Sequence, residues 1–171
     1  MNDIKAKPGA GFEFVIRREF DAPLDRVWRA WTEPERMAKW WGPRDFDIVS
    51  LKLDLRPGGA CHYLLRSPDG HDMWGKLTYR EIVPMQKLVF VVAFSDEVGG
   101  ITRHPLNEGW PLQIFSTVTF SERGGRTTIT VHWVPYEATD NEREVFEEGK
   151  ESMQAGWTGT LDRLQAFLAK A

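Results

Sequence analysis

The C-terminal stretch Thr139–Lys170 constrains the fold more than any other segment of the chain does. Large apolar residues recur in it at spacings of three, four or seven, which is typical of one face of an amphipathic helix. The spacing predicts a single helix over the whole stretch, about 45 Å long. Thr139 followed by Glu142 predicts a capping box at its start. The apolar stripe comprises Phe146, Met153, Trp157, Leu161, Leu164 and Leu168.

Glycines interrupt this predicted helix at Gly149, Gly156 and Gly159. Each lowers helix stability by about 0.5–1 kcal/mol relative to alanine. Gly149 and Gly156 fall about 20° apart on a helical wheel, at one edge of the apolar stripe. Two interpretations follow. Either the helix packs closely against a sheet at these positions, or the absent side chains leave room for a ligand, with Met153 and Trp157 as its wall.

Strand-like segments rich in β-branched and aromatic residues fill most of the chain before this helix. Two short helices are expected after the first strand, over 24–31 and 34–39, with Asp21 and Thr32 as candidate N-caps. Turns rich in Pro and Gly join the later strands, so an antiparallel sheet is expected. The expected strands are 12–20, 46–53, 60–66, 73–83, 87–94, 112–121 and 126–134.

This order predicts an α+β fold in which a curved sheet of seven antiparallel strands wraps around the C-terminal helix. A sheet with one apolar face needs a cover, and only the long helix is large enough to provide it. Residues 1–11 are expected to form a flexible leader, and residues 12–171 a single domain.

Charge and composition exclude several classes of partner. The formal net charge is −3, so no basic field points to nucleic acid. No apolar run approaches the roughly 18 residues that span a membrane. Cys61 is the only cysteine, so no internal disulfide forms, and a cytoplasmic location is expected.

No constellation of catalytic or metal-binding residues is evident. Cys61 and His62 are adjacent on one strand and face opposite ways, so they cannot form a dyad, and Cys61 is predicted to be a buried structural thiol. His71 and His132 are expected to face solvent. None of the four histidines fits a zinc pattern, and no nucleophile elbow or phosphate-binding loop is present. We therefore predict no catalytic residue, no metal and no cofactor.

Several motifs resemble domains similar to activators of the heat-shock-protein-90 ATPase, which belong to the START-like (SRPBCC, helix-grip) superfamily. The resemblance covers about residues 12 to 169. It is carried by Arg18-Glu19-Phe20-Asp21-Ala22-Pro23, Val27-Trp28-Arg29-Ala30-Trp31-Thr32-Glu33-Pro34-Glu35, Trp40-Trp41-Gly42-Pro43, Asp54-Leu55-Arg56-Pro57-Gly58-Gly59, Pro68-Asp69-Gly70, Gly75 with Glu81-Ile82, Val118-Thr119-Phe120, Thr127-Thr128-Ile129-Thr130, and Gly156-Trp157 with Leu161-Asp162-Arg163-Leu164.

The resemblance implies an apolar cavity between the sheet and the C-terminal helix. Members of the superfamily include co-chaperone domains, carriers of lipids or hormones, an antibiotic-resistance protein and aromatase/cyclases. The matching motifs are mainly turn and core residues, so they transfer no catalytic role to this chain.

Alternation along the strands and the helical stripe give most of the residues expected to line this cavity, and Trp40, Trp41 and Trp110 lie on loops that are expected to form its mouth. Of the adjacent Trp40 and Trp41, one is expected in the core and the other at an opening, and Tyr63 is the best polar contact for a ligand. The candidate ligand-binding residues are Trp40, Trp41, Cys61, Tyr63, Met73, Phe90, Trp110, Ile114, Val131, Trp133, Met153 and Trp157.

These observations predict a non-enzymatic protein that binds an apolar or aromatic small molecule. One alternative is a stress-response module that interacts with a chaperone, as the resemblance suggests. Another is an enzyme of the polyketide cyclase/aromatase type, which would need acid and base groups inside the cavity. The expected partners are an apolar small molecule and, for the first alternative, a chaperone, with the protein a monomer or homodimer.

Overall fold

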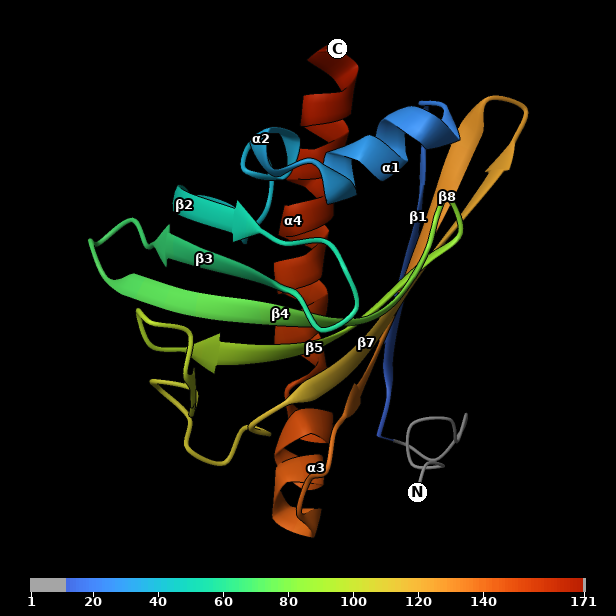
Figure 1. Ribbon diagram of the computed structural model, residues 1–171. Helices are drawn as coiled ribbons and strands as arrows, with labels where there is room; N and C mark the ends of the chain where they lie inside the picture. The colour runs from blue at the N-terminus through green and yellow to red at the C-terminus, as the bar shows by residue number, and fades with distance from the viewer. Residues whose placement is uncertain (1–11, 171) are drawn as a thin grey trace.

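The computed structural model describes residues 12–170 and shows a curved antiparallel sheet with the C-terminal helix lying across one of its faces (Figure 1). The leader predicted for residues 1–11 lies outside the described residues. The α+β helix-grip architecture expected from the sequence is confirmed. The sheet curls around the helix because twisted antiparallel strands form a concave face that a single helix can cover.

Seven long strands match the predicted ones, and a short additional strand lies in the predicted loop after residue 95. The order across the sheet is β1-β8-β7-β5-β4-β3-β2, and the short β6 pairs only with β5. All pairs are antiparallel. The strands are β1 Phe14–Phe20, β2 Asp47–Leu53, β3 Ala60–Arg66, β4 Asp72–Val83, β5 Lys87–Ser95, β6 Ile101–Thr102, β7 Ile114–Arg123 and β8 Arg126–Pro135.

Two short helices, α1 (Leu24–Thr32) and α2 (Pro34–Met37), follow β1 as predicted. The predicted side-chain caps are wrong, because Pro23 and Glu33 occupy the N-cap positions and neither caps through its side chain. The Thr32 hydroxyl instead donates to the carbonyl of Trp28 at 2.8 Å, so it stays within α1. The helix α2 also ends earlier than expected.

The predicted C-terminal helix is divided at Gly149 into α3 (Asp140–Glu148) and α4 (Lys150–Lys170). Gly149 departs from helical geometry, with φ −90° and ψ 10°. A Cβ on Gly149 would lie 3.0 Å from the ring of Trp110, so the indole contacts the backbone at the break. In Figure 1, α3 lies below α4 and prolongs it. Apolar periodicity continues through the break, which is why the sequence predicted one helix.

The predicted capping box at the start of α3 is confirmed. The Thr139 hydroxyl accepts from the Glu142 amide at 3.1 Å, and the Glu142 carboxylate accepts from the Thr139 amide at 3.0 Å. Glu142 also forms an ion pair with Arg103, whose guanidinium donates to the Trp110 carbonyl at 3.4 Å. The start of α3 therefore anchors the loop between β6 and β7.

The core lies between the concave face of the sheet, α1, α2 and the second half of α4. Trp31 is at its centre, with ring centroids 4.9 Å from Trp40, 5.8 Å from Phe120 and 6.4 Å from Trp157. The Trp40 indole donates to the Ala30 carbonyl at 3.0 Å, which satisfies its only polar atom. No helix in the described part of the chain is long and apolar enough to cross a membrane.

We predict that Glu142→Ala lowers the free energy of unfolding by about 1–2 kcal/mol, because it removes both the capping box and the partner of Arg103. Although burial alone would raise the pKa of Glu142, its hydrogen bonds to Arg103 and Thr139 hold that pKa below the usual value. The carboxylate therefore stabilises the fold above its unfolded pKa, and this stabilisation is lost as pH falls through its folded pKa.

Urea unfolding of the wild type and Glu142→Ala at pH 7 and near pH 3 measures this difference. The difference in the free energy of unfolding between the wild type and Glu142→Ala should be smaller at the lower pH. The matched control is Glu144→Ala on the exposed side of the same helix, which should change stability little. An equal loss for both variants at pH 7 would contradict the anchoring role of Glu142.

Candidate functional site

A cavity of about 450 Å³ lies between α4 and the sheet, on the side where α3 joins α4. It extends between the first half of α4, the loop after α2, strands β3 to β5, and the loop between β6 and β7. Its lining is mainly apolar and includes Trp41, Pro43, Tyr63, Leu65, Met73, Gly75, Val92, Phe94, Trp110, Leu112, Ile114, Trp133, Val145, Met153, Gly156 and Trp157. This volume falls within the range of small-molecule sites.

Three indole rings form one wall of the cavity. Trp157 on α4 lies 5.9 Å from Trp41 and 5.7 Å from Trp133 between ring centroids, and each pair is close to perpendicular, at 80° and 82°. Behind Trp157, Trp31 stacks parallel to it in the core. The core thus holds the indole of Trp157 in place, and its neighbours give the wall the edge-to-face arrangement that aromatic rings favour.

Tyr63 extends this wall because its cross-strand partner is Gly75. A Cβ on Gly75 would lie 2.4 Å from the phenol oxygen, so the ring rests directly on the backbone of β4. Burial raises the pKa of Tyr63 well above its usual value, and Cys61 adds to the rise, although a hydrogen bond with the Trp41 side chain opposes it. The phenol is therefore neutral at physiological pH and is a hydrogen-bonding group, not a base.

The structure brings most of the predicted ligand-binding residues together and leaves four of them elsewhere. Trp40, Cys61, Phe90 and Val131 are not among the lining residues, and none exposes more than 1% of its surface. Alternation placed Cys61, Phe90 and Val131 on the inner face, but at levels where core side chains fill the space against the sheet. Trp40 was expected on a loop at the mouth and is buried in the core instead. The predicted residues that line the cavity are Trp41, Tyr63, Met73, Trp110, Ile114, Trp133, Met153 and Trp157.

Trp40 and Trp41 separate as the sequence suggested, with Trp40 in the core and Trp41 at the cavity. Cys61 is a buried thiol, and burial raises its pKa to about 12, so it is not reactive. His71 is exposed as expected. His132 is half-buried instead of facing solvent, because its ring contacts the Glu13 carboxylate at 2.9 Å.

The glycines of the C-terminal helices have different environments, and both interpretations of them apply. A Cβ on Gly159 would lie 3.2 Å from the backbone nitrogen of Arg44, so this glycine allows close packing of α4 against the loop after α2. Gly149 contacts Trp110. Gly156 lines the cavity, and a Cβ there would have no heavy atom within 4 Å. The absent side chain of Gly156 therefore leaves open space.

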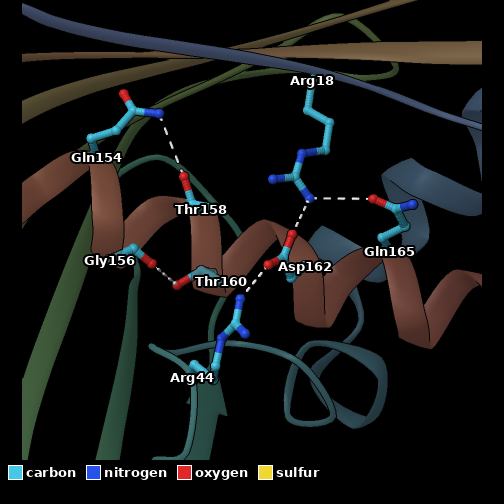
Figure 2. A network of polar contacts seen from close by, with 8 residues as sticks. All are labelled: Arg18, Arg44, Gln154, Gly156, Thr158, Thr160, Asp162 and Gln165. Carbon is cyan, nitrogen blue, oxygen red and sulfur yellow. Dashed lines mark hydrogen bonds and ion pairs between the residues drawn. The ribbon is translucent and has the colours of Figure 1, made fainter.

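Polar contacts from α4 hold the loop that carries Trp41 against the helix (Figure 2). Asp162 lies between Arg18 of β1, at 2.7 Å, and Arg44 of the loop, with which it also pairs. Arg163 donates to the carbonyls of residues 42, 43 and 46 at 3.3, 2.9 and 2.9 Å. Since residues 41–43 line the cavity, these contacts position one of its walls.

His104 also lines the cavity, and the sequence did not single it out. Its ring centroid lies 4.6 Å from Phe94 and 6.3 Å from Trp110. Its Nδ1 accepts from the Leu106 amide at 3.0 Å, and burial lowers its pKa. The imidazole is therefore neutral at pH 7, with its proton on Nε2. Loop residues follow no periodic pattern, so periodicity could not identify His104 as a lining residue. Only the tertiary structure shows that its loop lies against the cavity.

Charged groups are scarce in the lining. In the described part of the chain, Glu148, at the end of α3 and exposed, is the only acidic lining residue, and neither Lys nor Arg lines the cavity. No group of three or more metal-binding side chains occurs within residues 12–170. The cavity is thus an apolar, aromatic space with a few neutral hydrogen-bonding groups.

Comparison with protein families identifies one match, to Activator of Hsp90 ATPase homolog 1-like protein, over residues 21–169. The fold is similar to that of solved structures. One is a protein from Arthrobacter aurescens, with a TM-score of 0.77, 26% identity, and coverage of 94% of this chain and 88% of that one. Another is a protein from Nitrosomonas europaea, with a TM-score of 0.74, 23% identity, and coverage of 94% and 96%.

A further similar structure is DynU16, a protein of the dynemicin biosynthetic locus. The TM-score is 0.65 at 20% identity, and the match covers 92% of this chain but only 47% of DynU16. At this identity the likeness concerns the fold alone. No match was found among curated proteins.

We predict opposite effects on stability for alanine at two glycines of the same helix. Gly156→Ala should raise the free energy of unfolding by about 0.5–1 kcal/mol, because the methyl group meets no atom and alanine favours the helix. Gly159→Ala should lower it by about 1 kcal/mol or more, because the methyl group meets the backbone of Arg44, which the contacts of Arg163 hold in place.

Thermal or urea unfolding of the two single variants beside the wild type provides the measurement. Each variant is the control for the other, because both make the same change within one helix. A loss of stability in Gly156→Ala would show that the space beside Gly156 is filled in solution.

Proposed function

Because this chain belongs to the Activator of Hsp90 ATPase homolog 1-like family, within the START-like superfamily, we propose that it binds an apolar or aromatic small molecule in the cavity between α4 and the sheet. In this proposal the protein holds the molecule without transforming it. The observation that carries the proposal is Gly156, which faces open space in the middle of a long helix.

Glycine within a helix is unfavourable by about 0.5–1 kcal/mol relative to alanine, and at Gly156 no contact requires it. Gly159 and Gly149 have steric reasons in Arg44 and Trp110, whereas Gly156 has none. What the glycine preserves is the volume next to Trp157. A residue that lowers helix stability while keeping a cavity open is expected when the cavity has an occupant.

The lining suits an apolar and aromatic occupant. Trp41, Trp133 and Trp157 present indole rings in edge-to-face contact, so a planar guest can continue the same arrangement. Each 100 Å² of apolar surface that such a guest buries contributes about 2.5 kcal/mol. A few neutral polar groups fix orientation in sites of this kind.

A catalytic function has one observation in its favour, because His104 and Glu148 both line the cavity. No hydrogen bond or ion pair joins these two side chains within the described part of the chain. The Nδ1 atom of His104 is already occupied by the Leu106 amide, so its Nε2 carries the proton and cannot accept one. This arrangement supports a hydrogen-bond donor more than a general base.

The chaperone alternative is suggested by the name of the matched family and is separable by experiment. An ATPase-activating protein would stimulate its chaperone at micromolar concentration with or without an open cavity. Small-molecule binding depends on the cavity alone.

We predict that Gly156→Leu lowers the affinity for the neutral fluorescent probe N-phenyl-1-naphthylamine at least tenfold, because the isobutyl group projects into the space that the probe would occupy. Fluorescence titration measures the affinity, and circular dichroism with a thermal scan shows that the variant remains folded. Gly156→Ala should lower the affinity less than Gly156→Leu does, because its methyl group takes up less of the same space.

The matched control is Ala155→Leu, which adds the same bulk at the neighbouring, exposed position of α4. It should bind the probe as the wild type does. If folded Gly156→Leu bound the probe with unchanged affinity, the proposed cavity site would be wrong.

A further inference from the structure

We propose that His104 selects the ligand by donating its Nε2–H to a neutral oxygen acceptor, so that the preferred ligand is an uncharged aromatic ketone or amide and not a carboxylic acid or an amine. This inference rests on the proposed function and specifies the chemical class that the same cavity would bind. His104 lies in the loop between β6 and β7. It lines the cavity, and its ring contacts two other lining residues, Phe94 and Trp110.

The first step of the argument is the tautomer. The backbone amide of Leu106 donates to Nδ1 of His104 at 3.0 Å, so Nδ1 carries the lone pair. Burial lowers the pKa of the imidazole and keeps it neutral. The remaining proton is then on Nε2, and the neutral ring is a donor at that atom.

The second step is the direction of the free donor. Nδ1 is turned toward the loop's own backbone, and Nε2 is on the opposite side of the ring. Within residues 12–170, Nε2 has no hydrogen-bond partner, while Phe94 and Trp110 contact the ring. Since His104 is part of the cavity lining, its Nε2–H is available to a ligand in the cavity, which would replace water as its partner.

Asn107 repeats the same pattern. Its side-chain oxygen accepts from the Gly109 amide at 3.2 Å, so the NH₂ group of this lining residue is not needed by the turn and remains a donor. The indole N–H of Trp133 is buried without a partner in the described part of the chain. A buried donor without a partner is unfavourable, so the Trp133 indole favours a guest that carries an acceptor.

The third step is charge. Among residues 12–170, the lining contains neither Lys nor Arg, and its one formal charge is the carboxylate of Glu148. A carboxylate ligand would enter an apolar space without a counter-ion and would be repelled by Glu148, both of which are unfavourable. An ammonium group has no lone pair to accept from His104. A carbonyl oxygen accepts hydrogen bonds and carries no charge, so it fits both constraints.

Three naphthalene probes of nearly the same size test this inference: 2-acetonaphthone, 2-ethylnaphthalene and 2-naphthoate. Their affinities are measured by displacement of N-phenyl-1-naphthylamine from the wild type, His104→Phe and His104→Gln. The quantity compared is the ratio of ketone affinity to hydrocarbon affinity in each protein. General damage to the cavity would lower both affinities and leave this ratio unchanged.

In His104→Phe, which keeps a ring but loses the donor, the ratio should fall about 2- to 13-fold, the range of one net hydrogen bond. His104→Gln retains a donor and should keep part of the ratio. The exposed His71→Phe is the matched control and should not change it. 2-Naphthoate should bind most weakly to the wild type.

An unchanged ratio in His104→Phe, or tightest binding of 2-naphthoate, would overturn the inference while the proposed function stands. Failure of all neutral probes, including N-phenyl-1-naphthylamine, to bind the wild type would instead overturn the proposed function itself. If His104→Phe does not fold, ¹⁵N-histidine NMR of the wild type decides. His104 should be the Nε2–H tautomer at pH 7, with an Nε2 shift on adding the ketone and none on adding the hydrocarbon. A different tautomer or equal shifts would contradict the inference.

Discussion

The packing of α4 on the concave face of the sheet is the interaction on which the rest of the structure depends. Leu161 and Leu164 are fully buried in its second half, and Trp157 stacks on Trp31 at the centre of the core. Burying side chains of this size contributes about 1.5–3 kcal/mol each, so the helix and the curved sheet stabilise one another. Neither element has another apolar surface large enough to replace the other.

The same helix also sets the boundary between core and cavity. From Leu161 onward its apolar stripe contacts core side chains away from the cavity. Met153 and Trp157 pack in the core and also line the cavity, and Gly156 lines it as well. Asp162 attaches the loop after α2 to the helix through its ion pair with Arg44 (Figure 2). Arg163 attaches the same loop by donating to its carbonyls. A wall that contains Trp41 is thereby held in place by polar contacts just outside the apolar space.

The opposite wall depends on a second set of polar contacts. The capping box at Thr139 places Glu142 where it pairs with Arg103, and Arg103 lies next to His104 in the chain. The loop satisfies the acceptor atoms of His104 and Asn107 with its own backbone amides. Phe94 and Trp110 lie beside them in the lining, so this wall combines aromatic faces with the side chains of His104 and Asn107.

Much of the fold could be predicted from the sequence because it depends on local periodicity. Alternation of apolar and polar residues predicted the seven antiparallel strands, and the apolar stripe of residues 139–170 predicted the helix that packs against them. The break at Gly149 was missed because apolar periodicity continues through it, and the contact of Trp110 with the backbone there joins residues far apart in the chain. For the helical glycines the sequence allowed two roles, close packing or room for a ligand, but it could not say which role each glycine has.

The candidate site divides in the same way. Periodicity identified which side chains point inward, and it could not distinguish Tyr63, at the cavity, from Cys61, two residues away and fully buried. His104 escaped notice because its loop has no repeating geometry. The sequence by itself determined the elements and their inward faces, which are local properties of the backbone. Only the tertiary structure decided where those faces separate enough to leave a cavity, because that depends on distances between elements remote in the chain.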